Sequence, residues 1–468
     1  MRAQNLIQSL ASLRNTLAAI ALSRSVSTAV LPLRSLLLIT ALLIAQKTFA
    51  AVPSEDPAAW LRWLESGSSP VGFSLHTLAG LPGAPVSADV GYSDATSSLL
   101  AWTEQTLRLI QKYQQNPQRA VRTLAIIHAA MHDAFVLAAR RSGDGTEGLA
   151  AAHRAVSLTL AYLYPYESIG WIEGKGLALA YGWADRKEIG PARLQRELQI
   201  GEQVAGDAIR RALTDGSDRR TAAPPPLSPD PGRWRATPPL NIHIPQEPLA
   251  GEWRAWVRES GDIQPPPPAV YDSPKFWTEA EEVYRVWKNL TPKQKAIADD
   301  WNLQAGSVTP PGVWNQRAIE LLKSEKFAPA SAARVLAALN IAMNDAAIAC
   351  WRAKYHWWTV RPVTVIRERF DPNFLPHLIT PPHPSYVSGH ASVSGAAEAA
   401  LIAFFPERQS ELRAYAEEAA LSRLWGGIHY RSDNDEGLRL GRRVAERVMR
   451  RAFAATPDSN QRDAGKNP

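Results

Sequence analysis

Two short runs near the end of the chain contain cations that could hold an oxyanion. One run includes Lys354 and Arg361, which are seven residues apart, and the other includes Arg423. An arginine guanidinium donates paired hydrogen bonds to the oxygens of an oxyanion, and a lysine ammonium adds a compact charge. Two guanidinium groups and one ammonium therefore match a tetrahedral oxyanion, although each cation taken alone is more simply a surface charge.

A third run, Ser388-Gly389-His390, lies between these two and precedes a stretch of small residues that predicts a helix. Gly389 would let the backbone N–H approach a ligand closely, and amides at a helix N-terminus favour an anion. Ser388 can donate a hydroxyl hydrogen bond, and His390 can act as a general acid or base near neutral pH. Taken alone, the run is more simply a helix cap with a surface histidine.

His429 and Asp433 are four residues apart, so one helical turn would bring the carboxylate to a ring nitrogen. That hydrogen bond would fix the tautomer and make the other ring nitrogen a better nucleophile or ligand. A lone pair of this kind is more often a surface interaction. Only the combination of the three runs predicts an active site.

Together the three runs resemble the signature shared by vanadium-dependent haloperoxidases and the type 2 phosphatidic-acid and acid phosphatases. The matching string is Lys354-x6-Arg361-Pro362, then Ser388-Gly389-His390, then Ser422-Arg423-x5-His429-x3-Asp433. Val387 departs from the pattern, because the family usually has Pro there, but this change removes no functional group. The resemblance as a whole covers residues 98–454. Within this range, three further segments resemble bacterial haloperoxidase-type proteins: 232–239, 349–367 and 427–437.

The resemblance implies a role for each residue of the motif. His429 would bind vanadium axially or attack phosphorus to form a phosphohistidine, and Asp433 would orient it. His390 would be the acid or base, acting on bound peroxide or on a leaving alcohol. The equatorial oxygens of vanadate or phosphate would be held by Lys354, Arg361, Ser388, Gly389 (through its N–H) and Arg423. The cofactor would be vanadate in a haloperoxidase, whereas in a phosphatase the phosphate ester would be the substrate and no cofactor would be needed.

Two more residues occupy positions that face the site in the family. His383, five residues before Ser388, corresponds to a position that is His in bromoperoxidases and Phe in the chloroperoxidase. Its identity favours bromide or iodide over chloride, unless it is a loop histidine without a role. Trp351, three residues before Lys354, is the second position of this kind.

Three functions fit this signature. The first is a haloperoxidase that uses hydrogen peroxide and halide. The chain length, the lack of expected membrane helices and the similarity between residues 122–134 and 334–346 favour this function. The second is a secreted acid phosphatase that acts on a small phosphate ester. The third is a non-catalytic anion-binding protein of the same fold. The chain could also form a homodimer.

The N-terminal segment explains most of the positive charge. The 468-residue chain has a net charge of +7, but residues 1–54 hold five cationic side chains and no acid, so the remainder has a net charge of +2. Nucleic acid is therefore not an expected partner. Residues 1–50 have a positive flank, a short apolar run and a small-x-small ending at Ala50. This pattern predicts a signal peptide over 1–50 and a periplasmic or secreted protein. An organelle transit peptide or an uncleaved anchor is the alternative. No stable membrane span is expected after cleavage.

Apolar residues at intervals of three and four predict an all-α fold of two packed helical bundles. The expected parts are a Pro/Gly-rich lead-in over 51–95, an N-terminal bundle over 96–221, a loop over 222–272, a C-terminal bundle with the site over 273–455, and a disordered tail over 456–468. A helix over 329–354 extended to Pro362 would place Lys354 and Arg361 on one face.

Two features link the predicted bundles. Residues 122–134 and 334–346 align without gaps and are identical at seven positions, with Asp133 and Asp345 at the same place. We expect these acids to be structural. The loop over 222–272 is rich in proline but also holds Trp234, Trp253 and Trp256, so we expect an ordered loop that covers the site rather than a flexible linker.

Overall fold

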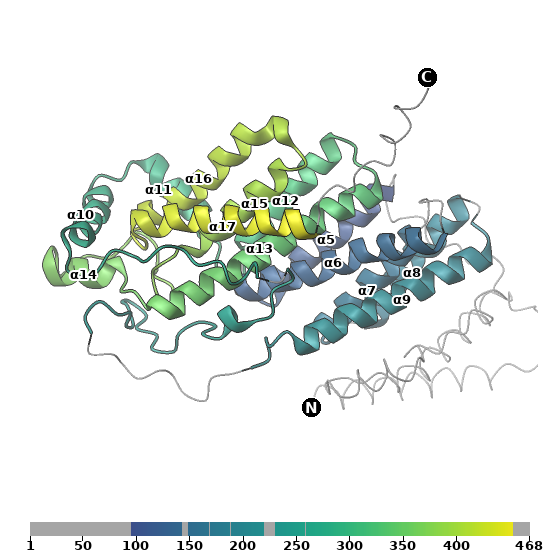
Figure 1. The fold of residues 1–468 in the computed structure, drawn as a ribbon, viewed down its shortest axis with the longest axis horizontal. Helices are drawn as coiled ribbons and strands as arrows, with labels where there is room; N and C mark the ends of the chain where they lie inside the picture. Colours follow the sequence, from purple (N-terminus) through teal and green to yellow (C-terminus); the bar gives the residue numbers. More distant parts are fainter. Residues whose placement is uncertain are drawn as a thin grey trace, which may run out of the picture. The chain divides into compact units, whose positions relative to one another are not determined.

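The computed structural model describes residues 95–142, 148–167, 169–187, 189–219, 230–257 and 259–452 (Figure 1). The regular secondary structure in these ranges is helical, apart from one isolated β-bridge between Arg233 and Thr359. The predicted all-α fold is therefore confirmed. The predicted signal peptide, the lead-in as far as residue 94 and the C-terminal tail lie outside the described residues.

Five helices form the first half of the described chain. Helix α7 is packed against α6, α8 and α9, and its apolar and small residues are almost all buried. Proline is the first residue of both α6 and α9, where its missing N–H costs nothing. The helices are α5 (Ala95–Lys112), α6 (Pro117–Ser142), α7 (Leu149–Leu163), α8 (Ile169–Arg186) and α9 (Pro191–Thr214).

The second half surrounds the long helix α13. Helix α15 packs along α17 and also against α13 and α16. The helices are α10 (Pro274–Lys288), α11 (Pro292–Asp300), α12 (Thr309–Ser324), α13 (Pro329–Trp357), α14 (Pro362–Arg369), α15 (Gly389–Ile402), α16 (Gln409–Trp425) and α17 (Arg431–Ala452), with short 3-10 turns at Ala250–Glu252 and Pro406–Arg408.

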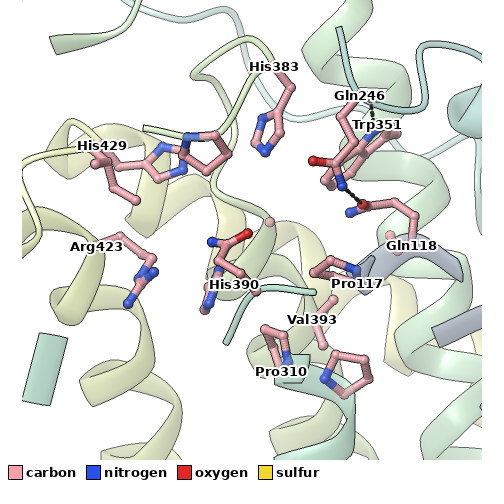
Figure 2. Close-up of a pocket in the computed structure, with 16 residues that line it drawn as sticks. Pro117, Gln118, Gln246, Pro310, Trp351, His383, His390, Val393, Arg423 and His429 are labelled. Atoms are coloured by element: carbon pink, nitrogen blue, oxygen red, sulfur yellow. Dashed lines mark hydrogen bonds between the residues drawn. The ribbon is translucent and has the colours of Figure 1, made fainter. Parts of the chain in front are cut away.

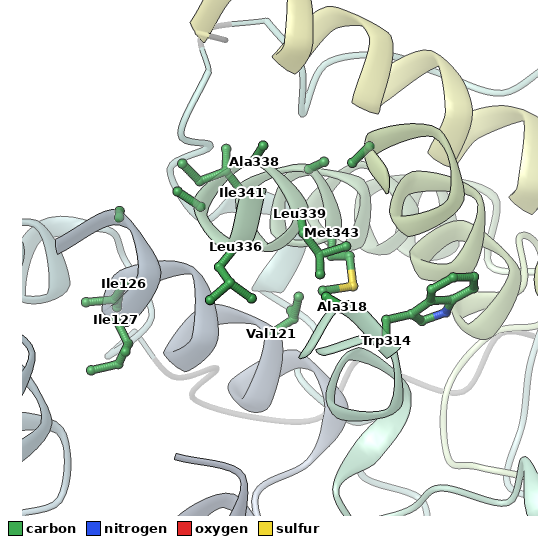
Figure 3. Close-up of a cluster of buried hydrophobic side chains, with 14 of the residues drawn as sticks. Val121, Ile126, Ile127, Trp314, Ala318, Leu336, Ala338, Leu339, Ile341 and Met343 are labelled. Atoms are coloured by element: carbon green, nitrogen blue, oxygen red, sulfur yellow. The ribbon is translucent and has the colours of Figure 1, made fainter. Parts of the chain in front are cut away.

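The two aligned segments lie in α6 and α13, and these helices pack against each other. Figure 3 shows side chains of both helices in one buried cluster, together with Trp314 of α12. The apolar core is thus shared by the two predicted bundles, whose limits stay a prediction. Both helices are long and apolar enough to pass a membrane-span test, but 72% and 94% of their apolar windows are buried inside the protein.

The described part of the proline-rich loop is held by its tryptophans, as predicted. Trp234 and Trp253 are buried, and Arg211 lies over the ring of Trp256. Asp345 accepts hydrogen bonds from the backbone N–H of Trp256 and Val257, at 2.8 and 2.9 Å, and from the Ser260 hydroxyl. Asp345 is therefore structural. Residues 222–229 of the predicted loop lie outside the described ranges.

The predicted continuous helix from Lys354 to Arg361 is wrong. Helix α13 ends at Trp357, because Trp358 adopts a left-handed conformation with φ 54°. Arg361 is instead the N-cap of α14, and Pro362 begins that helix rather than ending one. The two cations reach the same site from different helices.

Candidate active site

Lys354 and Arg361 are fully buried at the loop that precedes α15. Lys354 Nζ donates to the carbonyl oxygens of Pro384 and Ser385, both at 2.8 Å. Arg361 Nε donates to the His383 carbonyl at 2.8 Å, and its Nη1 donates to the Ile428 carbonyl at 2.7 Å. Both cations thus fix the backbone around the site while they concentrate positive charge there.

Arg423 is also fully buried, but one end of its guanidinium has no partner in the described part of the chain. Nε donates to the Ser422 hydroxyl at 3.0 Å and Nη2 to the Ala298 carbonyl at 3.2 Å, whereas Nη1 makes no hydrogen bond. A buried unpaired donor of a charged group costs about 1–3 kcal/mol or more. Because Arg423 lines a pocket, a bound anion is the natural partner for this nitrogen.

His429 and Asp433 form the predicted pair. Their Nδ1 and Oδ2 atoms are 2.8 Å apart and both side chains are buried. Helix α17 begins at Arg431, so His429 precedes the helix and only Asp433 lies in its first turn. The Asp433 carboxylate also accepts from the Ser385 hydroxyl at 2.6 Å and from the Tyr430 N–H at 3.2 Å.

This carboxylate fixes the tautomer of His429. With Nδ1–H donating to Asp433, Nε2 carries the lone pair. Arg361 Nη1 lies 3.1 Å from Nε2 and donates to it. The nitrogen that would bind or attack a ligand is therefore unprotonated and faces the cationic groups.

His390 is held by a backbone carbonyl. Its Nε2 lies 2.9 Å from the Trp301 carbonyl oxygen, just beyond the end of α11. Since a carbonyl only accepts, Nε2 carries the proton and Nδ1 is the nitrogen that can exchange one with a ligand. Helix α11 thus supplies carbonyl groups to two residues of the site, because Ala298 O binds Arg423.

Ser388 is the N-cap of α15, and Gly389 is the first residue of that helix. The Ser388 hydroxyl accepts from the Ala391 N–H at 3.4 Å, while its backbone N–H donates to the Asp433 carbonyl at 2.9 Å. A Cβ atom at position 389 would come within 3.2 Å of the Trp351 ring. The helix therefore begins against the site, with its positive end toward the pocket.

His383 and Trp351 also face the site, as predicted. Their ring centroids are 5.1 Å apart, and both side chains are buried. His383 Nδ1 lies 2.9 Å from Arg361 Nη2, which can only donate, and 3.2 Å from the Pro384 carbonyl oxygen, which can only accept. His383 thus brings a neutral imidazole beside the cations.

One pocket (Figure 2) is lined by six of the residues predicted from the sequence: Trp351, His383, Gly389, His390, Arg423 and His429. Arg361 and Asp433 hydrogen-bond to His429, Ser388 donates to Asp433, and Lys354 donates to the loop that precedes α15. Sequence reasoning missed other residues of the pocket wall and its supports: Pro117, Gln118, Gln246, Gln304, Pro310, Pro311, Ser385 and Trp301. Only Ser385, next to the Ser-Gly-His run, lay near a visible motif.

Burial dominates the electrostatics of the pocket. It lowers the pKa of Lys354 to about 7, of Arg423 to about 9 and of Arg361 to about 10. The pKa values of all three pocket histidines are well below the usual range, because of burial and then the nearby cations. Burial also raises the pKa of Asp433 to about 6. The site therefore favours an anion that would restore the charged forms of its cations.

The fold and the site define a class of protein: an all-α protein with a cluster of buried cations beside an unprotonated histidine nitrogen. A family model described as "VCPO second helical-bundle domain" matches residues 334–373 and 406–456. This match includes both arginines, Lys354 and the His429–Asp433 pair.

Solved structures agree with this family model. A bacterial vanadium-dependent iodoperoxidase is 26% identical, with a TM-score of 0.65, over 76% of this chain and 96% of its own. A bacterial vanadium-dependent chloroperoxidase is 17% identical in its holo and apo forms, with TM-scores of 0.53 and 0.55. These alignments cover 72% of this chain and 92% and 94% of the two chloroperoxidase chains, and they show the fold alone. No curated protein sequence matches significantly.

These findings agree with the predicted resemblance: residues 334–373 and 406–456 match a domain of the vanadium haloperoxidase family, and the fold is similar to that of bacterial vanadium-dependent haloperoxidases.

Proposed function

We propose that this protein is a vanadate-dependent haloperoxidase that oxidises iodide or bromide with hydrogen peroxide. The observation that carries the proposal is the unpaired Nη1 of Arg423, buried in a pocket that also contains His429. The similarity to a vanadium-dependent iodoperoxidase over nearly its whole length supports this chemistry. The alternatives share the anion site but lack this support.

The residues present fit vanadate. Arg423 offers an unused donor, Lys354 and Arg361 add two buried cations, and Ser388 and Gly389 begin a helix directed at the same place. When bound, vanadate would supply a Lewis-acidic centre that activates hydrogen peroxide toward halide. His429 Nε2 would be its protein ligand, and Arg361 Nη1 would then turn from Nε2 to the anion.

Protons in this proposal move at two histidines and an acid. Asp433 keeps the proton of His429 on Nδ1, so Nε2 stays a lone-pair donor. His390 exchanges a proton through Nδ1, because the Trp301 carbonyl holds Nε2–H. The low pKa of His390 means that it is neutral and can accept a proton from hydrogen peroxide near neutral pH.

His383 supports a preference for iodide or bromide. Its neutral imidazole lines the pocket, with its ring centroid 5.1 Å from that of Trp351. A buried imidazole and indole suit a large, weakly hydrated halide better than chloride. The halide preference is tested by comparing kcat/KM for iodide, bromide and chloride in the wild type and in His383→Phe. The substitution should raise kcat/KM for chloride relative to kcat/KM for iodide and bromide.

The phosphatase and the non-catalytic protein are separated from this proposal by one purified sample assayed in two ways. We expect hydrogen peroxide-dependent halide oxidation that requires added orthovanadate. Hydrolysis of a small phosphate ester that orthovanadate inhibits, without halide oxidation, would establish the phosphatase instead. A sample that binds the anion but shows neither halide oxidation nor ester hydrolysis would indicate the non-catalytic protein.

We further propose a periplasmic or secreted protein, on the charge and apolar pattern of residues 1–50. Mass spectrometry of the protein recovered from the exported fraction should give an N-terminus close to residue 51. An intact leader in a membrane fraction would favour the uncleaved anchor.

A further inference from the structure

The wall of the pocket that faces His429 comes from other parts of the fold. Figure 2 shows Arg423 and His429 on one side of the pocket and Pro117, Gln118 and Gln246 on the other. Helix α6 supplies Pro117 and Gln118, whereas the proline-rich loop supplies Gln246. These three side chains carry no charge, so this wall contributes shape rather than attraction for an anion.

The two glutamines are joined across the wall. Gln246 Nε2 donates to Gln118 Oε1 at 3.2 Å, and Gln118 is only 5% exposed. A bond between neutral amides leaves the charge of the pocket unchanged. It does link α6 to the loop, so that the two side chains occupy the space as a unit.

The backbone of Gln246 is anchored on several sides. Its N–H donates to the Pro382 carbonyl at 2.8 Å, and its carbonyl accepts from Trp351 Nε1 at 3.3 Å and from the Tyr355 hydroxyl at 2.6 Å. The neighbouring Glu247 forms a two-bond ion pair with Arg119, at 2.7 and 2.8 Å. The wall can therefore move aside only if these interactions break.

The position of the Gln118–Gln246 pair affects which organic groups could be attached to an anion in the pocket. Because the attacking and leaving groups of a transferred phosphoryl group are roughly in line, an organic group on an anion held by His429 would point away from that histidine. The opposite side of the pocket is where the amide pair stands. An organic substituent would meet Gln118 and Gln246 there.

We propose that the Gln118–Gln246 pair is a specificity-determining element, which admits small inorganic anions and excludes anions that carry a bulky organic group. The inference rests on the anion site of the proposed function and deepens it. It also explains why the pocket would suit peroxide and halide better than the ester of a large alcohol.

Binding of two phosphonates tests this inference. Methylphosphonate and phenylphosphonate share one charged head group, differ in size and cannot be hydrolysed. By isothermal titration calorimetry, the wild type should bind phenylphosphonate at least about tenfold more weakly than methylphosphonate. Gln118→Ala and Gln246→Ala should each bind phenylphosphonate about tenfold more tightly than the wild type, with methylphosphonate within about twofold.

Matched variants separate size from hydrogen bonding. Gln118→Met and Gln246→Met keep the side-chain volume without the amide and should behave like the wild type. Gln203→Ala removes an exposed glutamine of α9, outside the pocket, and should change neither affinity. Serine replacements give the same comparison if an alanine variant does not fold.

Equal affinities for both phosphonates in the wild type, or the same gain in the methionine variants as in the alanine variants, would overturn the inference and leave the anion site intact. Failure of the wild type to bind methylphosphonate at all would overturn the anion site of the proposed function, and this inference with it.

Discussion

Arg423 has a buried guanidinium nitrogen without a partner in the described chain, as expected for a residue that binds a ligand. Protein groups satisfy Nε and Nη2, while Nη1 is left for something that the chain does not provide. Replacing a buried charge by an apolar side chain of similar length is often neutral or stabilising.

We therefore predict that Arg423→Met raises the free energy of unfolding by about 1–2 kcal/mol without anion. The same variant should bind orthovanadate at least about tenfold more weakly, because a charge-assisted hydrogen bond is lost. Chemical denaturation and vanadate titration measure the two effects. A variant that loses more than about 1 kcal/mol of stability would mean that Arg423 is primarily structural.

Lys354 makes anion binding depend on pH. Its pKa is about 7 in the folded protein, below its usual value of 10.5, chiefly because of burial. Above pH 7 the free protein therefore holds a neutral amine, and a bound anion favours the ammonium. Binding should take up a proton at pH 8 and weaken as the pH rises, whereas this uptake should vanish below about pH 6.

Calorimetry of phosphate binding at pH 8 in buffers of different ionisation enthalpy measures this uptake. Lys354→Arg is the matched control, since its guanidinium is already protonated at that pH and should take up no proton through this residue. Equal proton uptake in both proteins would assign the effect to another group.

The His429–Asp433 pair gives a third test at the residue scale. Asp433→Asn replaces an acceptor-only carboxylate by an uncharged amide that can also donate to Nδ1, so Nε2 is no longer reliably free. Loss of such a supporting partner costs about 10–100-fold in affinity or activity. Halide oxidation by this variant should fall within that range, and an unchanged rate would show that the tautomer is set elsewhere.

At the scale of elements, α6 and α13 share a sequence pattern but use its acid differently. Asp345 of α13 is fully buried and accepts from two backbone N–H groups of the loop, whereas Asp133 of α6 is 64% exposed beside His132. The same residue type at the same place is thus a loop anchor in one helix and a surface acid in the other.

Asp345→Ala should destabilise the protein by about 3 kcal/mol, because it leaves buried N–H groups unpaired. Asp133→Ala is the natural control and should change stability by less than about 0.5 kcal/mol. Thermal or chemical unfolding of both variants checks the difference. Equal effects would contradict the anchoring role of Asp345.

The elements also show where sequence reasoning succeeds and where it fails. Periodicity predicted the all-α fold, and the structure adds local signals such as the capping box of Thr291 and Gln294 at the start of α11. The break between Lys354 and Arg361 could not be seen, because Trp358 adopts a left-handed conformation that usually requires glycine.

At the scale of the whole molecule, the motif predicted the half of the pocket that carries charge, but not the opposite wall. Gln118 and Gln246 come from distant segments and meet only because α6 and the proline-rich loop fold over α13. The carbonyl of Trp301, which holds His390, has no side-chain signature at all. Such contacts depend on tertiary packing, which one sequence does not display.

A crystal structure of the protein soaked with orthovanadate tests the central claim most directly. We expect one anion in the pocket, within hydrogen-bonding distance of Arg423 Nη1 and bound to His429 Nε2, and a lower occupancy of that anion in Arg423→Met soaked at the same subsaturating concentration. A pocket that stays empty at saturating orthovanadate, or vanadate bound only on the surface, would contradict the claim.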